Sequence, residues 1–516
     1  MINKQTTKAE EIAAESAQLF VLLLLLSYLV VLLGGTLAIS ARRLFWNDEL
    51  FTYYIATLPT FSQVLSALST GAEQIPPAYY AVVRESLWIL GNNSIALRLP
   101  SLIGFLIMAV ALFKFVSRRL SPVYGTIAAL LPVLTSARYY SGEARPYGLE
   151  LGLAALALLC WQRTGEAKHR LLAVGGLWFS LAAAISCHYY GVLLILPLAL
   201  GEAVRTIDQR KLDFTIWACF AASLLPLLFM PQLILAAAKN VGTFWAPPNW
   251  SNLSGFYNNL LGKRGAPVVA ILVIAMTVRL FLTLGRGKEL QARKGDFSSD
   301  EIAAILGFTA LPLFGLLLAE FVTKAFVDRY VLSAVLGISI LFVQALHRLL
   351  GERIHIASGI ALLLLAYLVS RELQDISSAS DGRNDLERSV TFLRSSNEQN
   401  LPIVIGVPHT FLLLSHYAPS DVKSHLVYLA NPILAGRLLG VTSIENGMVQ
   451  LAGPFFQMKV VPFDAFLASN SRFLLYGSRH WNWVNQALSE RGVNFEFLAV
   501  LGDIYLYSVA PPPKMR

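Results

Sequence analysis

The sequence contains little charge and little cysteine. Only 14% of its 516 residues are Asp, Glu, Lys or Arg, whereas an ordinary soluble domain has about a quarter. The three cysteines, Cys160, Cys187 and Cys219, lie in or at the ends of apolar runs. Their spacing fits neither a zinc site nor a disulfide framework, so we expect small core residues at these positions.

Several motifs that would indicate a cofactor or a known chemistry are also missing. The sequence has no G-x-G-x-x-G, no P-loop and no G-x-S-x-G nucleophile elbow, and its His, Asp and Glu residues show no closed metal spacing. No run of basic residues is interleaved with aromatic ones, so the net charge of +9 does not indicate a nucleic-acid partner. We therefore expect no cofactor, no metal site and no nucleic-acid binding.

Long apolar runs dominate what the sequence does contain. Hydrophobic residues make up 55% of the chain and gather in runs of about 17 to 22 residues, enough to cross roughly 30 Å of hydrocarbon as a helix. This pattern predicts an all-α polytopic membrane protein. The first run is too long for a signal peptide and lacks a clear cleavage site, so we expect a retained helix. The candidate spans, about eleven in number, are 19–39, 98–116, 122–137, 148–161, 171–187, 191–204, 213–235, 266–284, 300–319, 331–346 and 356–370.

The basic residues predict how these spans are oriented. With a cytoplasmic N-terminus, the inner segments are 1–18, 117–121, 162–170, 205–212, 285–299 and 347–355. They carry a higher density of Lys and Arg than the longer outer segments, which is typical of cytoplasmic loops. An odd number of crossings then places the tail outside. We expect a multi-pass protein of the inner (plasma) membrane with an extracytoplasmic C-terminal domain.

The first outer loop, about 40–97, is long enough to carry structure of its own. Residues 61–68 predict a short surface helix. The stretch 76–90 is apolar, but it is only about 15 residues long and carries Arg84 and Glu85. We therefore expect an interfacial helix with its aromatic side chains at headgroup level. If this stretch crossed the membrane instead, Glu143 would lie on the opposite face from Asp48.

The character of the chain changes after residue 370. Short β-like runs at 402–407, 426–429, 472–477, 495–501 and 504–509 alternate with helix-like stretches such as 385–394 and 480–491. That alternation predicts a small α/β domain. The chain therefore divides into a transmembrane domain, 1–370, and an outer domain, 371–516.

Three carboxylates are candidates for catalysis. Asp48 and Glu49 stand side by side just after the first span, where two charges are costly to desolvate. The topology places a third acid, Glu143, on the same face. A carboxylate within reach of a hydroxyl acceptor can serve as a general base. A structural alternative stays open, because an acidic pair also caps a helix that follows it.

The outer loops also collect basic and aromatic residues that could hold a lipid phosphate and a sugar. Arg and Lys neutralise phosphate, and Arg does so with bidentate contacts. Two structural alternatives remain: Glu143 and Arg145 could form a simple loop ion pair, and a histidine such as His188 is more often a satisfied interfacial residue. The candidates for donor or phosphate binding are Arg145, His188, Tyr189, Lys263, Arg264, Arg329 and Tyr330.

Several motifs, taken in order along the chain, resemble those of the GT-C fold membrane glycosyltransferases. The likeness covers about residues 19–370, and the most similar groups are protein O-mannosyltransferases and aminoarabinose transferase-like enzymes (glycosyltransferase family 39-like). The motifs are Trp46-Asn47-Asp48-Glu49, Gln74 to Tyr80, Ala96 to Ser101, Tyr139 to Leu149, Cys187 to Gly191 and Asp328-Arg329-Tyr330.

The resemblance implies an inverting transferase that takes a sugar from a polyprenyl-phosphate carrier on the outer face without a metal. At the matching positions Asp48 would be the general base, Glu49 its neighbour, and Glu143 the acid that orients the acceptor or the base. Arg329 and Tyr330 would lie near the donor phosphate. The partners would be membrane lipid, a polyprenyl-phosphate sugar, and an envelope glycan, lipid or protein as acceptor.

Two other functions also fit a polytopic chain. A transporter or flippase is expected to place ionisable residues at mid-membrane and to show inverted repeats, whereas most charges here lie in loops. A lipid-linked oligosaccharide ligase or polymerase would use the same kind of carrier. A comparison of monosaccharide and oligosaccharide lipid donors distinguishes it from a monosaccharide transferase.

Overall fold

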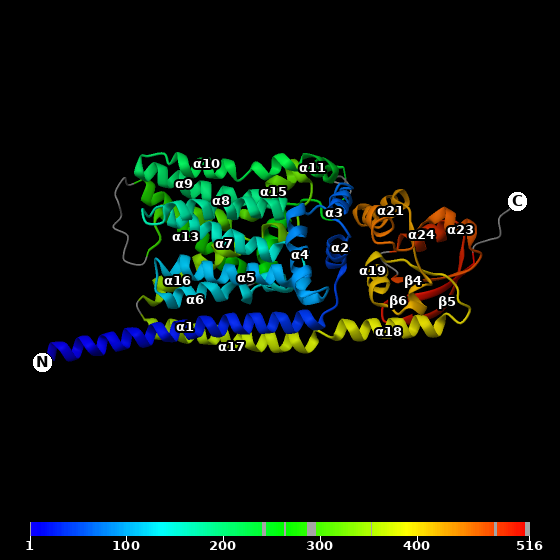
Figure 1. Ribbon diagram of the computed structural model, residues 1–516, viewed down its shortest axis with the longest axis horizontal. Coiled ribbons are helices and arrows are strands. Elements are labelled where there is room, and N and C mark those ends of the chain that lie inside the picture. The colour runs from blue at the N-terminus through cyan, green and yellow to red at the C-terminus, as the bar shows by residue number, and fades with distance from the viewer. Residues whose placement is uncertain are drawn as a thin grey trace.

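A computed structural model describes residues 2–239, 244–262, 265–285, 296–351, 353–478 and 482–510. It consists of a bundle of long helices with a smaller α/β region at one end (Figure 1). The helices of the bundle are α1 (Ile2–Arg42), α5 (Ser94–Ser117), α6 (Pro122–Leu130), α7 (Tyr147–Arg163), α8 (Arg170–Cys187), α9 (Ile195–Gln209), α10 (Phe214–Ala222), α11 (Pro231–Ala238), α13 (Gly265–Gly285), α14 (Ser299–Thr309), α15 (Leu311–Leu318), α16 (Ala334–Leu350) and α17 (Ile354–Ser378).

Every apolar run that predicted a span is helical, because a helix satisfies its own backbone where water is absent. Six described helices are long and apolar enough to cross a membrane, or up to eight if each of two bent pairs is one span. The predicted count of about eleven is therefore not confirmed. The runs 122–137, 148–161 and 331–346 fall short because they form shorter helices; α7 and α16 have 17 residues each, about 26 Å of helix against roughly 30 Å of hydrocarbon.

Close packing of α5 on α7 sets the position of the loop between them. A Cβ on Gly104 would lie 2.3 Å from the carbonyl oxygen of Gly148, and one on Gly152 would lie 2.3 Å from that of Gly104. Only glycine permits this approach of two helix backbones. The loop, which contains the 3-10 helices η1 (Leu131–Leu134) and η2 (Ser136–Gly142), is thereby held over the start of α5.

Three short helices from the first loop lie across the end of the bundle, between it and the α/β region (Figure 1). They are α2 (Asn47–Ala56), α3 (Phe61–Leu68) and α4 (Pro77–Leu90). The surface helix predicted at 61–68 is present with those bounds; Thr60 caps it by accepting the N–H of Gln63 at 3.2 Å. The ambiguous stretch 76–90 forms α4, which is not among the helices long enough to span. Asp48 and Glu143 consequently lie at the same end of the bundle.

The remaining helices connect these parts. They are η3 (Tyr189–Leu194), η4 (Leu225–Phe229), α12 (Ser251–Leu261), the π-helix η6 (Ala319–Thr323) and η7 (Asp328–Val331).

The C-terminal region is built on a mixed six-stranded sheet of order β3-β2-β1-β4-β6-β5. The first four strands in this order are parallel to one another. Strand β6 is antiparallel to both of its neighbours, β4 and β5. The strands are β1 (Ile403–Ile405), β2 (Leu426–Ala430), β3 (Val460–Pro462), β4 (Phe473–Ser478), β5 (Asn494–Leu501) and β6 (Ile504–Ala510). Sequence analysis located five of them and missed the edge strand β3, which has only three residues, none of them buried.

Helices flank this sheet, and α18 (Asp381–Ser396) continues from α17 toward it (Figure 1). Residue 370, the predicted domain boundary, lies inside α17. The other helices of the C-terminal region are α19 (Pro408–Tyr417), α20 (Ser420–Lys423), α21 (Pro432–Leu439), α22 (Ser443–Gly447), the π-helix η8 (Met448–Ala452), α23 (Phe463–Ser469) and α24 (Trp483–Glu490).

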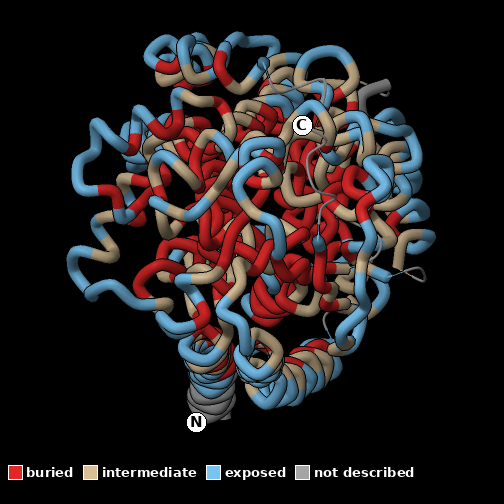
Figure 2. The backbone as a smooth tube through the Cα atoms, turned by 90° about the vertical axis from the view of Figure 1, so that its right-hand side faces the viewer, coloured by how far each residue is buried: buried red, intermediate tan, exposed pale blue. Residues whose placement is uncertain are grey.

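One hydrophobic cluster joins the first loop to the C-terminal region. It combines Leu50, Ile55 and Tyr79 with Phe411 and Met448, each of which is at most 1% exposed. Viewed from the C-terminal end, buried residues fill the middle of the molecule and exposed ones form its rim (Figure 2). The C-terminal region is thus packed on the helices that carry the acidic pair.

Candidate active site

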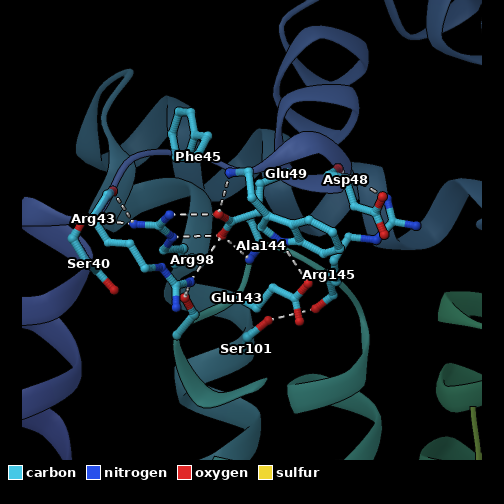
Figure 3. A network of polar contacts seen from close by, with 12 residues as sticks. Ser40, Arg43, Phe45, Asp48, Glu49, Arg98, Ser101, Glu143, Ala144 and Arg145 are labelled. Atoms are coloured by element: carbon cyan, nitrogen blue, oxygen red, sulfur yellow. Dashed lines mark hydrogen bonds and ion pairs between the residues drawn. The ribbon is translucent and has the colours of Figure 1, made fainter. Parts of the chain in front are cut away.

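Glu49 lies at the centre of a buried network (Figure 3). Its side chain is fully buried and accepts two hydrogen bonds from Arg98 of α5, each of 2.7 Å. It also accepts the N–H of Ala144 at 2.8 Å and that of Trp46 at 3.3 Å. Burial raises the pKa of Glu49, but the charge and hydrogen bonds of Arg98 outweigh it and hold the pKa below its usual value. The contact with Trp46 shows that the capping alternative holds for Glu49.

Asp48 is the member of the pair that faces an open space. Its side chain is 19% exposed, and Oδ2 accepts a hydrogen bond of 2.9 Å from Arg329. Its Oδ1 accepts only a longer contact, 3.3 Å, from Asn47. The first turn of α2 therefore directs the Glu49 carboxylate inward to Arg98 and the Asp48 carboxylate toward a small pocket.

Arg145 lies next to Asp48 and is held by an acid that sequence analysis did not select. Its guanidinium donates to Glu73 at 3.1 and 3.3 Å and to the backbone oxygen of Asp48 at 3.3 Å. Its own carbonyl accepts the hydroxyl of Ser101 at 2.7 Å, which fixes the loop to α5. Glu73 stands directly before the Gln74–Tyr80 motif, and that position was the one signal that could have identified it. Arg145 therefore forms its ion pair with Glu73 and not with Glu143, as one structural alternative had it.

Glu143 is buried behind the pocket. Its Oε1 accepts the indole N–H of Trp46 at 2.9 Å, while Oε2 has no hydrogen-bond partner among the described residues. Burial, followed by the nearby charges of Glu49 and Asp48, raises the pKa of Glu143 to about 8. At neutral pH this carboxyl is therefore mostly protonated and can donate a hydrogen bond from its second oxygen.

The histidine and tyrosines at the site form an aromatic wall. The His188 ring lies 5.3 Å from that of Tyr147 and 5.1 Å from that of Tyr330, and Tyr330 lies 4.8 Å from Tyr190. His188 Nδ1 is 3.3 Å from an oxygen of the buried Glu150. Tyr189, which sequence analysis selected, does not line the pocket, whereas its neighbour Tyr190 packs into the wall.

Two further candidates, Lys263 and Arg264, lie outside the described residues.

A pocket of about 120 Å³ lies among these groups, although Glu49, Glu143 and Tyr190 do not line it. Charge alternates within it, since two carboxylates face two guanidinium groups, and such an arrangement suits a ligand that carries both phosphate and hydroxyls. Its charged and aromatic lining consists of Asp48, Glu73, Arg145, Arg329, Tyr147, His188, Trp245 and Tyr330, to which α22 adds Ser443, Ile444 and Gly447. Within the described part of the chain no three His, Cys, Asp or Glu residues are grouped to hold a metal ion.

A second cavity, of about 660 Å³, lies on the other side of the Trp46-Asn47 segment. It is bounded by the C-terminal end of α1, by η2, by the junction of α17 and α18, and by His409 and Thr410 at the start of α19. Asn47 lines both cavities. The segment that carries Asp48 thus separates a small charged pocket from a larger one.

Comparison with solved structures gives this arrangement its context. The ArnT protein from Cupriavidus metallidurans in the apo state matches with a TM-score of 0.58 over 96% of this chain and 98% of that chain, at 13% identity. The chain has the GT-C fold of membrane glycosyltransferases. ArnT bound to undecaprenyl phosphate matches the GT-C chain with a TM-score of 0.56 and 12% identity over the same shares.

Sequence comparison adds one match. Residues 74–235 match the family model of dolichyl-phosphate-mannose-protein mannosyltransferases, a range that includes Glu143, Arg145 and His188. An oligosaccharyltransferase from Archaeoglobus fulgidus matches 92% of this GT-C chain and 72% of its own length at 12% identity, with a TM-score of 0.46, too low to support an argument. No curated protein sequence matches. The two ArnT matches confirm the GT-C fold expected from the motifs.

Proposed function

We propose that the protein is a glycosyltransferase that moves a sugar from a polyprenyl-phosphate carrier to a hydroxyl acceptor at the outer face of the membrane. One observation carries the proposal: the Asp48 carboxylate lines a small pocket together with Arg145 and Arg329, at the loop end of a GT-C bundle. A base and two cations are the groups that such a transfer needs.

The pair of arginines supports a phosphate-linked donor. Arg329 is 13% exposed and Arg145 only 7%, so both cations are largely withdrawn from water. A guanidinium in such surroundings attracts phosphate far more strongly than one in water. ArnT, which shares the fold, has been solved with undecaprenyl phosphate bound. A lipid of this kind would place its phosphate between Arg145 and Arg329.

The transfer itself requires one proton movement. The acceptor oxygen attacks the anomeric carbon from the face opposite the phosphate, a C–O bond forms, and the bond from that carbon to the phosphate oxygen breaks with its electron pair. Asp48 takes the acceptor proton, and the departing phosphate keeps the extra negative charge, which Arg145 and Arg329 stabilise. Glu143, protonated at neutral pH, would support the acceptor or the base through its free oxygen.

Ion pairs at the opposite end of the bundle support the proposed orientation. The segments assigned to the cytoplasmic side, together with the first residues of the span predicted at 300–319, are joined through Arg119–Glu301 (2.8 Å), Arg205–Asp300 (2.7 Å) and Arg348–Asp296 (3.2 Å). They therefore lie together, away from the C-terminal region. Since basic residues concentrate on the cytoplasmic side, the pocket and residues 371–516 would face the outside.

The test is turnover by purified protein in lipid nanodiscs. Undecaprenyl-phosphate-linked hexoses and pentoses would be supplied with an envelope lipid extract, and released undecaprenyl phosphate measured by mass spectrometry. We expect Asp48→Asn to lower turnover by at least about a hundredfold, the usual loss of a general base. Asp385→Asn, a change at an exposed acid of α18, is the matched control and should leave turnover unchanged.

Two results would refute the proposal. One is near-normal turnover by the folded Asp48→Asn protein. The other is wild-type protein that releases no undecaprenyl phosphate from any donor. An oligosaccharide-linked donor in the same assay separates a ligase from a monosaccharide transferase, and flipping of an unreacted lipid in vesicles would indicate a flippase.

A further inference from the structure

The pocket beside Asp48 is completed by a helix from the C-terminal region. Ser443, Ile444 and Gly447 of α22 belong to its lining, whereas the other lining residues come from the first 330 residues of the chain. The C-terminal region therefore contributes side chains to the site itself. A helix in this position can influence which substrate fits.

A buried carboxylate fixes α22 within the C-terminal region. Glu445 is 4% exposed and accepts the hydroxyl of Tyr428 at 2.6 Å and the N–H of Asn431 at 3.0 Å. Tyr428 belongs to β2, so these hydrogen bonds tie α22 to the sheet. Because a buried carboxylate is tolerated only with such partners, α22 has little freedom to move away from this position.

Packing also fixes α22 against the helix that carries Asp48. A Cβ on Gly447 would lie 3.1 Å from the ring of Phe51 in α2, so a larger residue here would require that ring to shift by a few tenths of an ångström. The Phe51 ring in turn packs edge-on against Phe456 at 5.6 Å. The wall formed by α22 and the carboxylate of Asp48 are thus held in a fixed relation.

Ser443 is the polar group that this wall presents. Its Oγ is shielded from solvent and has no hydrogen-bond partner among the described residues. The charged groups of the same pocket are paired, Asp48 with Arg329 and Arg145 with Glu73. Leaving a buried hydroxyl unpaired is unfavourable. A hydroxyl both donates and accepts, which suits a sugar hydroxyl.

We propose that Ser443 contacts the sugar of the donor and helps to select it, by hydrogen-bonding one of its hydroxyl groups while Arg145 and Arg329 hold the phosphate. The inference rests on the proposed function and deepens it, because it assigns part of sugar recognition to the C-terminal region. Glu445 and Tyr428 act as positioning residues that hold Ser443 at the pocket.

The experiment compares Ser443→Ala with wild type in the nanodisc assay. We expect kcat/KM for the best undecaprenyl-phosphate sugar to fall about tenfold, the size of one lost hydrogen bond. The inhibition constant of undecaprenyl phosphate, which carries no sugar, should stay unchanged. Ser443→Thr retains a hydroxyl and should recover part of the loss, and Ser469→Ala, at an exposed serine of α23, is the matched control.

A series of donors, each lacking one sugar hydroxyl, identifies the contact. Wild type should lose activity on removal of one particular hydroxyl, and Ser443→Ala should be insensitive to the same removal. Equal kcat/KM in Ser443→Ala and wild type would overturn the assignment, as would a parallel rise in the inhibition constant of undecaprenyl phosphate. Wild-type protein that turns over no donor would refute the proposed function and this inference with it.

Discussion

Replacing Glu49 by Gln should destabilise the protein, although the neighbouring change Asp48→Asn should not. Glu49 is fully buried, and Arg98, its partner, is 1% exposed. Both carboxylate oxygens accept from Arg98, and each also accepts a backbone N–H. A glutamine at this position would turn one N–H donor toward the guanidinium or toward a backbone N–H. The positive charge of Arg98 would then be buried without compensation.

The loss expected from such an uncompensated charge is about 3–5 kcal/mol. This corresponds to roughly two to four orders of magnitude in the folding equilibrium, a large part of the stability of an ordinary protein. The Asp48–Arg329 pair is 19% and 13% exposed, so water can replace part of what Asp48→Asn removes. The two adjacent acids should therefore separate into one whose loss destabilises the protein and one whose loss lowers turnover.

Thermal unfolding in detergent, followed by the fraction of monodisperse protein, measures the difference. Glu49→Gln should lower the midpoint by about 5 °C or more, and Glu85→Gln, a change at an exposed acid of α4, should not. Changing both Glu49 and Arg98 to apolar residues of similar volume should recover much of the loss, since no unpaired charge remains. A Glu49→Gln protein as stable as wild type would refute the reasoning.

Three further outcomes are expected. Burial raises the pKa of Glu143 to about 8. Between about pH 5 and 8 the unfolded chain therefore releases this proton while the folded protein keeps it, so the stability of the wild type falls as pH rises over that range. The unfolding midpoint of Glu143→Gln should fall less over the same range. Arg329→Gln should raise the inhibition constant of undecaprenyl phosphate about ten- to a hundredfold, as expected for a lost charge-assisted hydrogen bond, and an unchanged constant would place the phosphate elsewhere. Tyr428→Phe, which removes one of the two hydrogen bonds to Glu445, should lower kcat/KM for the sugar donor in the way that Ser443→Ala does, while the inhibition constant of undecaprenyl phosphate stays the same.

The sequence predicted the parts of the fold that depend on local pattern. Apolar runs located the helices of the bundle, because spanning helices are apolar on nearly every side. Alternating short runs located most of the strands. Strand β3 was missed because three residues, none of them buried, give no period to detect. The apolar runs did not predict the number of membrane crossings, because helices such as α7 and α16 are apolar but short.

At the site, the sequence by itself determined which chemical groups are present and at which end of the bundle they lie. Only the tertiary structure decided their contacts. Asp48 and Glu49 are neighbours, yet successive residues of a helix point about 100° apart, so one meets Arg329 and the other Arg98. Glu73 was signalled only by its place before the Gln74–Tyr80 motif, and no local pattern indicates that Ser443 of α22 reaches the same pocket. Which acid is buried with a charge and which faces a pocket is a property of packing between segments, and for that reason it became visible only in the folded chain.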